Sequence, residues 1–448
     1  MSEELLYEAI ARAPLYRREG TVVAVLGDTV SVRGVPLLPD EMVAIADPAG
    51  RPLIAQASGT RTAAARVTVL ERGVIEVGAR VRAMGRGLEA PVGEALVGRV
   101  LDGLGRPLDG RPLPRSLRWV PADAPPPPAL ERPPIRRSLA TGVRAVDGFL
   151  TLGRGQRVGI FAGSGVGKST LLGMLARGTT AEVTVLALIG ERGREVREFI
   201  DHDLGPDALA RCVVVASTSD NPPAMRLGAA KVATAIAEGF RNEGYDVLLL
   251  FDSLTRVAMA QREIGLAAGE PPTTRGYPPS VFSVLPQLVE RAGPSARGSI
   301  TAIYTVLVDG DDLDEPIADL ARATLDGHIV LSRALANAGH YPPIDVLASV
   351  SRLAPKVASA DHLAAATRLR SLLAAYEEAR DLIAIGAYVR GADPRVDEAM
   401  DLRGDLEAFL RQRPDDLTPF DAAVRRLQEI AGMSGQAPAA DAMWRDAA

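Results

Sequence analysis

One nine-residue stretch constrains this chain more than any other feature of its sequence. Residues 162–170 carry the sequence AGSGVGKST, between an apolar run at 158–161 and a second apolar run that starts at Leu171. The first run has the character of a buried strand and the second that of a helix start. Glycines let such a loop wrap around a phosphate with its N–H groups pointing inward, and the helix N-terminus adds partial positive charge. The stretch therefore predicts a phosphate-binding loop within an α/β fold.

Individual residues of this loop suit separate parts of a nucleotide. Lys168 has the reach to contact the β- and γ-phosphates, and the Ser169 hydroxyl is a suitable ligand for Mg²⁺. Ala162 stands where such loops usually have their first glycine, and its small side chain is tolerable there. The residues that we expect to bind the nucleotide are Gly163, Ser164, Gly165, Val166, Gly167, Lys168, Ser169 and Thr170.

Two carboxylates follow other apolar runs. Asp252 ends the run at 247–251, and Glu191 comes just after the run at 183–189. Ligands of a parallel sheet bind beyond the carboxyl ends of its strands, so Asp252 should face the phosphates and hold the Mg²⁺ shell. Glu191 should emerge at the same edge, where it can orient and deprotonate a water that attacks the γ-phosphate. The alternatives are a helix-capping role for Asp252 and a solvated turn for Glu191.

Arg352 lies far along the chain from the loop. Charge that develops on a phosphoryl group in the transition state is commonly stabilised by an arginine from a neighbouring subunit. Arg352 is a candidate for this role, and an ordinary surface arginine is the alternative.

The N-terminal part has the pattern of a small β-barrel. From residue 20 to about 87, short β-branched runs are broken by glycines, which is typical of a closed or nearly closed barrel. Residues 22–26 and 29–32 flank Gly27 and Asp28, which indicates a hairpin. Further strands are expected at 42–45, 66–70, 74–77 and 80–84.

The middle and the end of the chain differ in the spacing of their apolar residues. Between 141 and 352, near-continuous apolar runs alternate with helical stretches such as 224–243, which predicts a mainly parallel sheet with helices on both faces. The expected strands include 158–161, 183–189, 213–215, 247–251 and 300–307.

After Arg352 the apolar spacing is helical, and Asp393-Pro394 and Thr418-Pro419 have the pattern of N-cap and N1 pairs. Residues 121–128, which include four successive prolines, predict an extended connection. A surface crossover is the simplest interpretation, and a ligand for another protein is the alternative. The expected organisation is an N-terminal segment at 1–19, a β-barrel domain at 20–88, a catalytic domain at 89–355 and a helical domain at 356–448.

Composition removes several classes of protein. The 448 residues carry 51 Lys+Arg against 56 Asp+Glu, a net charge of −5, and only 4% aromatic residues, which disfavours nucleic-acid binding. Cys212 is the single cysteine, so no internal disulfide forms, and a reducing compartment is indicated. No apolar run approaches the ~18 residues of a membrane span, and no secretory signal is present. The four histidines lack metal spacing, and the acidic run at 309–315 lacks the spacing of a calcium loop. We expect a soluble, cytoplasmic protein.

Together, these motifs resemble the type III secretion ATPases, which are the flagellar and injectisome relatives of the rotary ATP synthase catalytic subunit. The resemblance runs from about residue 20 to 412. Its most specific stretches are FAGSGVGKST at 161–170, LIGERGREV at 188–196, DSLTR at 252–256, GEPPTTRGYPPSVF at 269–282 and DGHIVLSR at 326–333.

The resemblance implies a RecA-like P-loop core that hydrolyses ATP with Mg²⁺, an N-terminal β-barrel and a C-terminal helical domain. It implies that Glu191 is the catalytic carboxylate and that Arg352 is an arginine finger acting on a neighbouring subunit. It also places Arg192 beside the phosphates, Tyr341 against the adenine, and residues 269–279 toward the central channel of a ring.

Since one chain carries both Glu191 and Arg352, a homohexameric ring would have a complete site at every interface. By resemblance, the partners are stator or regulator proteins, a central stalk, an export-gate membrane protein, and secretion chaperones with their substrates. No nucleic acid is expected, and the location is cytoplasmic and peripheral at the inner membrane. Leu5, Leu6, Ala9 and Ile10 suit a short amphipathic helix for a partner or the membrane, and a frayed terminus is the alternative.

The leading hypothesis is an ATPase that releases chaperones and unfolds substrates for export. The rotary synthase catalytic subunit and a Rho-type RNA translocase are its rivals, and a nucleotide-binding ring without turnover is a third. Residues 201–204, 217–220 and 409–412 favour the injectisome branch, whereas residues 385–388 are closer to flagellar members.

Overall fold

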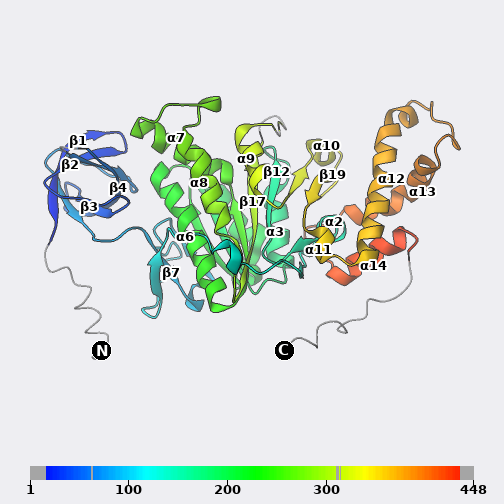
Figure 1. Cartoon of the computed structure of the whole chain (residues 1–448), viewed down its shortest axis with the longest axis horizontal. Helices are drawn as coiled ribbons and strands as arrows, with labels where there is room; N and C mark the ends of the chain where they lie inside the picture. Colours follow the sequence, from blue (N-terminus) through cyan, green and yellow to red (C-terminus); the bar gives the residue numbers. More distant parts are fainter. Residues whose placement is uncertain (1–16, 62–63, 309–311, 313, 434–448) are drawn as a thin grey trace. The chain divides into compact units, whose positions relative to one another are not determined.

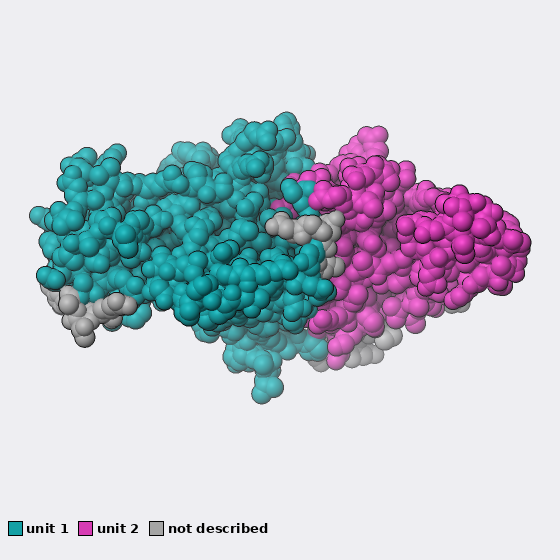
Figure 2. All heavy atoms as spheres, turned by 90° about the horizontal axis from the view of Figure 1, so that it is seen from above, with its two compact units in different colours: residues 1–134, 155–164, 181–325 teal, residues 135–154, 165–180, 326–448 magenta. Residues whose placement is uncertain are grey.

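The computed structural model describes residues 17–61, 64–308, 312 and 314–433 (Figure 1). The chain forms two compact units, coloured separately in Figure 2. Unit 1 comprises residues 1–134, 155–164 and 181–325, and unit 2 comprises residues 135–154, 165–180 and 326–448. The predictions for Leu5 to Ile10 and most of the acidic run at 309–315 lie outside the described residues.

Unit 1 begins with a closed β-barrel, which confirms the barrel expected from the sequence (Figure 1). Its strands follow one another around the barrel in the order β1-β2-β5-β4-β3-β6. They are β1 (Glu19–Leu26), β2 (Thr29–Arg33), β3 (Met42–Ala46), β4 (Pro52–Arg61), β5 (Ala64–Val69) and β6 (Arg80–Ala83). The predicted hairpin forms between β1 and β2, where Gly27 has a φ of +57° that favours glycine.

Two barrel predictions were wrong. Residues 74–77 form no strand, because Val74 and Val77 are both exposed and only Ile75 packs against the barrel core. Strand β4 was missed, although it pairs with both β3 and β5. Its sequence, PLIAQASGTR, mixes polar and small residues and so lacks the apolar alternation by which the other strands were found.

The second sheet of unit 1 is mainly parallel, as predicted, and runs in the order β12-β17-β15-β13-β14-β8. A short strand, β16 (Gly293–Pro294), pairs with β17 in the antiparallel sense. The parallel strands are β8 (Arg99–Leu101), β12 (Arg157–Ala162), β13 (Val183–Ile189), β14 (Cys212–Ser217), β15 (Asp246–Asp252) and β17 (Ser299–Leu307).

Helices cover this sheet and share one hydrophobic core with it. The long helix α6 packs against α7, β13, β14 and β15, and α7 packs against α8 and β17 (Figure 1). Their apolar faces exclude water from strands such as β13, in which every residue is buried. The helices of unit 1 are α4 (Gly193–Glu198), a π-helical turn (Phe199–Leu204), α5 (Gly205–Leu209), α6 (Pro223–Glu243), α7 (Leu254–Ala268), α8 (Pro279–Glu290) and α9 (Pro316–Thr324), with short 3₁₀ turns at Glu94–Leu96, Ala129–Glu131 and Thr274–Gly276.

The proline-rich passage is extended, as predicted. It follows β9 (Arg118–Pro121), which pairs with β7 (Glu89–Val92), and residues 122–128 then form neither helix nor strand. Two arginines hold it to the helical layer. Arg291 donates a hydrogen bond to the Ala122 carbonyl at 2.9 Å, and Arg132 donates one to the Pro127 carbonyl at 3.0 Å.

Unit 2 contains short strands followed by a helical part, and in the described residues the last strand lies just before Arg352, as predicted. The strands β18 (Gly327–Leu331) and β19 (Ile344–Ser351) pair antiparallel, as do β10 (Ser138–Leu139) and β11 (Leu152–Gly153). The helices are α2 (Arg144–Phe149), α3 (Lys168–Gly178), α10 (Arg333–Asn337), α11 (Ala354–Val357), α12 (Ala360–Ala384), α13 (Pro394–Leu410) and α14 (Phe420–Ile430).

The two predicted helix starts in the helical part had different outcomes. Helix α13 begins at Pro394, and the Asp393 side chain caps it by accepting a hydrogen bond from the Arg395 N–H. Helix α14 begins one residue later than predicted, with Pro419 at the cap. The Thr418 hydroxyl instead accepts a hydrogen bond from the Arg144 guanidinium at 3.1 Å, which removes it from the capping position.

Candidate nucleotide site

The phosphate-binding loop starts in unit 1 and continues into unit 2. Strand β12 ends at Ala162, whose carbonyl accepts a hydrogen bond from the Val308 N–H at 3.1 Å. Ala162 and Gly163 are buried, and Ser164 is exposed. The small side chain of Ala162 therefore fits the position where a glycine is usual.

In unit 2, the rest of the loop leads directly into helix α3. Gly165 and Gly167 have φ angles of +75° and +98°, which residues with a Cβ rarely adopt. Gly167 is the N-cap of α3, and in the described part of the chain no side chain caps this helix start. The first-turn N–H groups, next to Lys168 and Ser169, are thus arranged to bind an anion.

The structure places Tyr341 beside the end of this loop. A Cβ added to Gly167 would lie 3.6 Å from Tyr341 Cε1, so the aromatic ring is within van der Waals range of the loop. Tyr341 is 48% exposed, and its backbone carbonyl accepts a hydrogen bond from the Gln412 N–H at 2.8 Å. A half-exposed aromatic ring at this position offers a stacking surface for a base.

Glu191 and Asp252 lie at the ends of neighbouring strands of unit 1. Strand β13 pairs with β15 so that Leu188 lies opposite Asp252, and Glu191 follows β13 by two residues. Glu191 is partly exposed, and its carbonyl accepts a hydrogen bond from the Ser219 N–H at 2.9 Å. The structure therefore brings the two predicted acids to one edge of the parallel sheet, the edge at which β12 also ends.

Asp252 is 4% exposed and its carboxylate has a fixed neighbour. The Thr305 hydroxyl, on β17, donates a hydrogen bond to Asp252 Oδ1 at 2.6 Å. Ser253, the next residue, is fully buried and caps α7 by accepting from the Arg256 N–H. Asp252 itself therefore ends a strand and does not cap the helix.

The two predicted arginines both lie at the surface of their units. The Arg192 side chain is 75% exposed and pairs with Glu195 at 3.3 Å, at the start of α4. Arg352 directly follows β19, is exposed, and donates its backbone N–H to the Asp326 carbonyl at 3.0 Å. An exposed Arg352 is accessible to a second protein chain.

The oxygen donors in these segments suit Mg²⁺. Mg²⁺ prefers carboxylate and hydroxyl oxygens and usually takes only one or two protein ligands, with phosphates and water completing its shell. Asp252 and Ser169 are donors of this type. Among the described residues, no three His, Cys, Asp or Glu side chains gather as a metal site.

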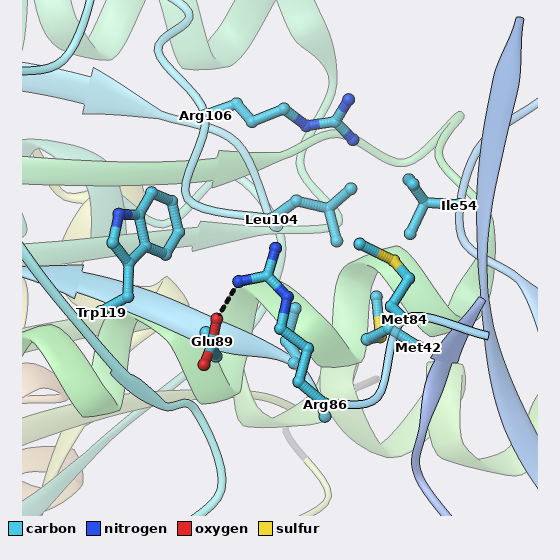
Figure 3. A pocket seen from close by; sticks show the side chains of 10 residues that line it. Met42, Ile54, Met84, Arg86, Glu89, Leu104, Arg106 and Trp119 are labelled. Carbon is cyan, nitrogen blue, oxygen red and sulfur yellow. Dashed lines mark hydrogen bonds and ion pairs between the residues drawn. The ribbon is translucent and has the colours of Figure 1, made fainter. Parts of the chain in front are cut away.

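A separate pocket of about 220 Å³ lies in unit 1, between the barrel and the pair of strands β7 and β9 (Figure 3). Its lining is mostly apolar, with Arg86 and Glu89 paired at its side (Figure 3). None of the predicted nucleotide-binding residues lines it. The lining residues are Met42, Ile54, Met84, Arg86, Gly87, Leu88, Glu89, Leu104, Arg106 and Trp119.

Thr305 was not predicted from the sequence. Its neighbours in β17 are Tyr304 and Val306, so nothing in the local sequence distinguishes this threonine from the other residues of a buried strand. Its link to Asp252 joins residues 53 positions apart in the chain and becomes visible only once β15 and β17 are paired.

A loop of this type on a mainly parallel sheet, with acids at the ends of neighbouring strands, defines a P-loop nucleotide-binding protein. The model of the ATP synthase alpha/beta family, nucleotide-binding domain, matches residues 142–351, and that of the T3SS EscN ATPase C-terminal domain matches residues 358–429. The chain belongs to the family of flagellar and type III secretion ATPases, and it is an ATPase. None of the helices in the described ranges is long and apolar enough to cross a bilayer.

Individual relatives come from both branches of this family. The chain is 48% identical over 435 residues to the flagellum-specific ATP synthase of Bacillus subtilis, covering 96% of this chain and 99% of the relative. It is 50% identical over 439 residues to the type 3 secretion system ATPase of Xanthomonas euvesicatoria, covering 96% and 97%.

Its fold matches a solved structure of the assembled ATPase EscN from the type III secretion system of enteropathogenic E. coli. The TM-score is 0.87 at 43% identity, and the match covers 92% of this chain and 100% of EscN. The predicted RecA-like, barrel and helical architecture is thereby confirmed.

Proposed function

We propose that this ATPase hydrolyses Mg²⁺–ATP at the subunit interfaces of a homohexameric ring and uses the energy to release chaperones from export substrates and to unfold them. The observation that carries the proposal is the shared edge of the parallel sheet, where β12 leads into the phosphate loop and Glu191 and Asp252 follow β13 and β15. In a parallel sheet this edge is where a ligand binds.

Each residue has a role in this proposal. The loop N–H groups and Lys168 bind the phosphates, and Tyr341 stacks against the adenine. Ser169 and Asp252 hold Mg²⁺, which when bound neutralises charge on the phosphate oxygens. Glu191 orients the attacking water and accepts its proton. Arg192 neighbours the phosphates.

Arg352 completes the site from a neighbouring subunit. A guanidinium that stabilises the transferring phosphoryl group must reach a site on another chain, and the exposure of Arg352 fits that requirement. The relative EscN has been seen assembled and in complex with its central stalk, EscO, which supports self-association and a stalk partner for this chain.

Mixing two inactive variants tests the shared site. Glu191→Ala retains Arg352, and Arg352→Ala retains Glu191, so each alone should lack hydrolysis. If sites form between subunits, an equal mixture regains roughly one quarter of the wild-type rate, because that share of interfaces combines both intact residues. Lys168→Ala mixed with Glu191→Ala is the matched control and should regain nothing, because Lys168 and Glu191 serve the same subunit. A mixture of the first pair that remains inactive would contradict the proposal.

The biological setting is part of the same proposal. A cytoplasmic ring, peripheral at the inner membrane, would bind a stator or regulator and an export-gate protein as well as chaperones. The injectisome branch stays a prediction from the sequence, since the relatives include both flagellar and type III secretion ATPases. Co-purification of the stator and stalk proteins from the native host distinguishes the two branches.

A further inference from the structure

Strand β17 lies between the strand that leads into the phosphate loop and the strand that ends at Asp252. Thr305 of β17 is opposite Ile160 of β12, and the preceding residue, Tyr304, is opposite Phe251 of β15. The Thr305 side chain is fully buried, and its hydroxyl donates to Asp252 Oδ1 at 2.6 Å. A single side chain thus connects the central strand to the carboxylate.

Packing alone does not account for a threonine here. The residues around it in β17, Ile303, Tyr304 and Val306, are fully buried, and valine has nearly the same shape as threonine without a hydroxyl to desolvate. A buried hydroxyl is tolerated when it has a partner. The Thr305 hydroxyl has two acceptors within reach, the Phe251 carbonyl at 3.4 Å and Asp252 Oδ1 at 2.6 Å. The bond to the carboxylate is the shorter one, and a charged acceptor makes it stronger than a bond between neutral groups. Because χ1 of threonine is stiff, the donor also has a fixed direction.

We propose that Thr305 is a positioning residue for the Mg²⁺–nucleotide, acting through Asp252. The inference rests on the proposed role of Asp252 and adds a second residue to it. The Thr305 hydroxyl holds Oδ1 and so sets the plane of the carboxylate. Asp252 then presents its oxygens to the metal shell in one orientation before the nucleotide binds, which lowers the entropic cost of binding.

A second threonine on the same strand provides a matched control. Thr301 is 2% exposed, and its hydroxyl accepts a hydrogen bond from the Gly155 N–H at 2.8 Å. It lies nearer the amino end of β17, away from Asp252. Thr301→Val therefore removes a buried, hydrogen-bonded hydroxyl from β17 without touching the carboxylate.

The test measures Mg²⁺-dependent binding of a fluorescent ADP analogue to the full chain, without turnover. Mg²⁺ is titrated at fixed nucleotide, and its midpoint is compared with the nucleotide affinity in EDTA. Thr305→Val should raise the Mg²⁺ midpoint roughly tenfold while the affinity in EDTA stays unchanged. Thr305→Ser, which keeps the hydroxyl, should restore the midpoint to within about twofold, and Thr301→Val should match the wild type.

The outcomes separate this inference from the proposed function. If Asp252→Asn raises the Mg²⁺ midpoint but Thr305→Val does not, Thr305 has no positioning role and the proposed function stands. If Asp252→Asn leaves the midpoint unchanged, the proposed metal role of Asp252 is wrong, and the inference fails with it. Thr305→Ala repeats the measurement should the valine variant fold poorly. An equal rise in Thr301→Val would show a general effect of losing a hydroxyl from β17 and would also overturn the inference.

Discussion

The barrel and the parallel sheet of unit 1 are both rich in valine, but they bury their strands differently. In β5 of the barrel, buried and partly exposed residues alternate, with Val67 and Val69 inside and Arg66 and Thr68 toward the outside. In β13 of the parallel sheet, all seven residues are buried. The barrel closes on itself and leaves its outer face exposed to solvent, whereas the sheet is covered by helices.

This difference explains why the proposed catalytic acids lie at the sheet and not in the barrel. A strand buried on both faces can carry charged groups only at its ends, and parallel strands bring those ends to one edge. Glu191 and Asp252 converge for this reason. In β5 of the barrel, by contrast, Arg66 and Thr68 lie along the outer face of the strand rather than at its end.

The largest effect should come from a strand end. Glu191→Gln removes the proposed base but keeps the shape of the side chain, so ATP hydrolysis should fall by about 10²–10⁴-fold. Phosphate release measures the loss. Because Glu191 is partly exposed at the edge of the sheet, thermal unfolding should be unchanged. A variant that hydrolyses ATP at the wild-type rate would contradict the idea that the catalytic groups lie at the strand ends.

A strand interior should show the opposite behaviour. Leu186, in the middle of β13, is fully buried, so Leu186→Ala should lower the free energy of unfolding by about 2–5 kcal/mol through lost burial and a cavity. Urea unfolding followed by circular dichroism measures it. Loss of hydrolysis without loss of stability would show that this strand interior also serves the chemistry.

The helical part of unit 2 adds a pH-dependent case. His362 is 2% exposed, and its Nε2–H donates to the Gly148 carbonyl at 2.8 Å. Burial lowers the pKa of His362 from its usual 6.5. Below pH 6.5 the unfolded chain binds a proton that the folded chain resists, so stability should fall with acid by at most about 1.4 kcal/mol per pH unit for this group.

Thermal unfolding between pH 7 and pH 5 measures this dependence. His362→Gln keeps a donor for Gly148 but does not titrate, so between pH 7 and pH 5 it should lose less stability than the wild type. Burial raises the pKa of Asp147 to about 7, so this group stabilises the fold as the pH falls, equally in both proteins. His340, whose pKa burial also lowers, leaves part of the slope in place. An unchanged slope in His362→Gln would show that His362 does not contribute to it.

A helix cap should matter less. The Asp393 side chain accepts from the Arg395 N–H at 2.9 Å at the start of α13, so Asp393→Ala should cost about 1 kcal/mol. Denaturant unfolding measures this change. Asp393→Ser, which keeps a capping oxygen, is the control and should recover most of the loss. Equal losses in the two variants would assign the effect to the ion pair with Arg395 rather than to the cap.

The smallest effect should come from the outer face of the barrel. Thr68 of β5 points away from the barrel core, so Thr68→Lys should change the free energy of unfolding by no more than about 0.5 kcal/mol. A charged side chain in the interior of β13, in contrast, could not reach water. A loss of several kcal/mol at Thr68 would show that the barrel, like the sheet, is covered on both faces.

Local patterns were enough to predict much of the fold. Each of three elements can be recognised from its own residues, by a turn or by the spacing of its apolar side chains. They are the hairpin around Gly27, the long helix α6 and the strand β13. Strand β4 has no such pattern, because its pairing with two neighbours, rather than its own apolar alternation, defines it.

The candidate site divides in the same way. Lys168, Glu191 and Asp252 stand in compact motifs, so their positions after strands were predictable from spacing. The place of Tyr341 beside Gly167 depends on residues more than 170 positions apart, and only the family resemblance indicated it. Thr305 had neither a motif nor a resemblance to reveal it, because its significance lies in a hydrogen bond between two strands.

The proline-rich passage has a mechanical consequence. Its four successive prolines, 125–128, are extended, and a polyproline segment at ~3.1 Å per residue is already close to the ~3.3–3.6 Å limit of a stretched chain. Arg291, which holds the passage at Ala122, is itself buried in an ion pair with Glu238 of α6 at 2.6 Å. Because the passage can lengthen very little, a force applied to it would be transmitted to α6 through Arg291 after only a small extension.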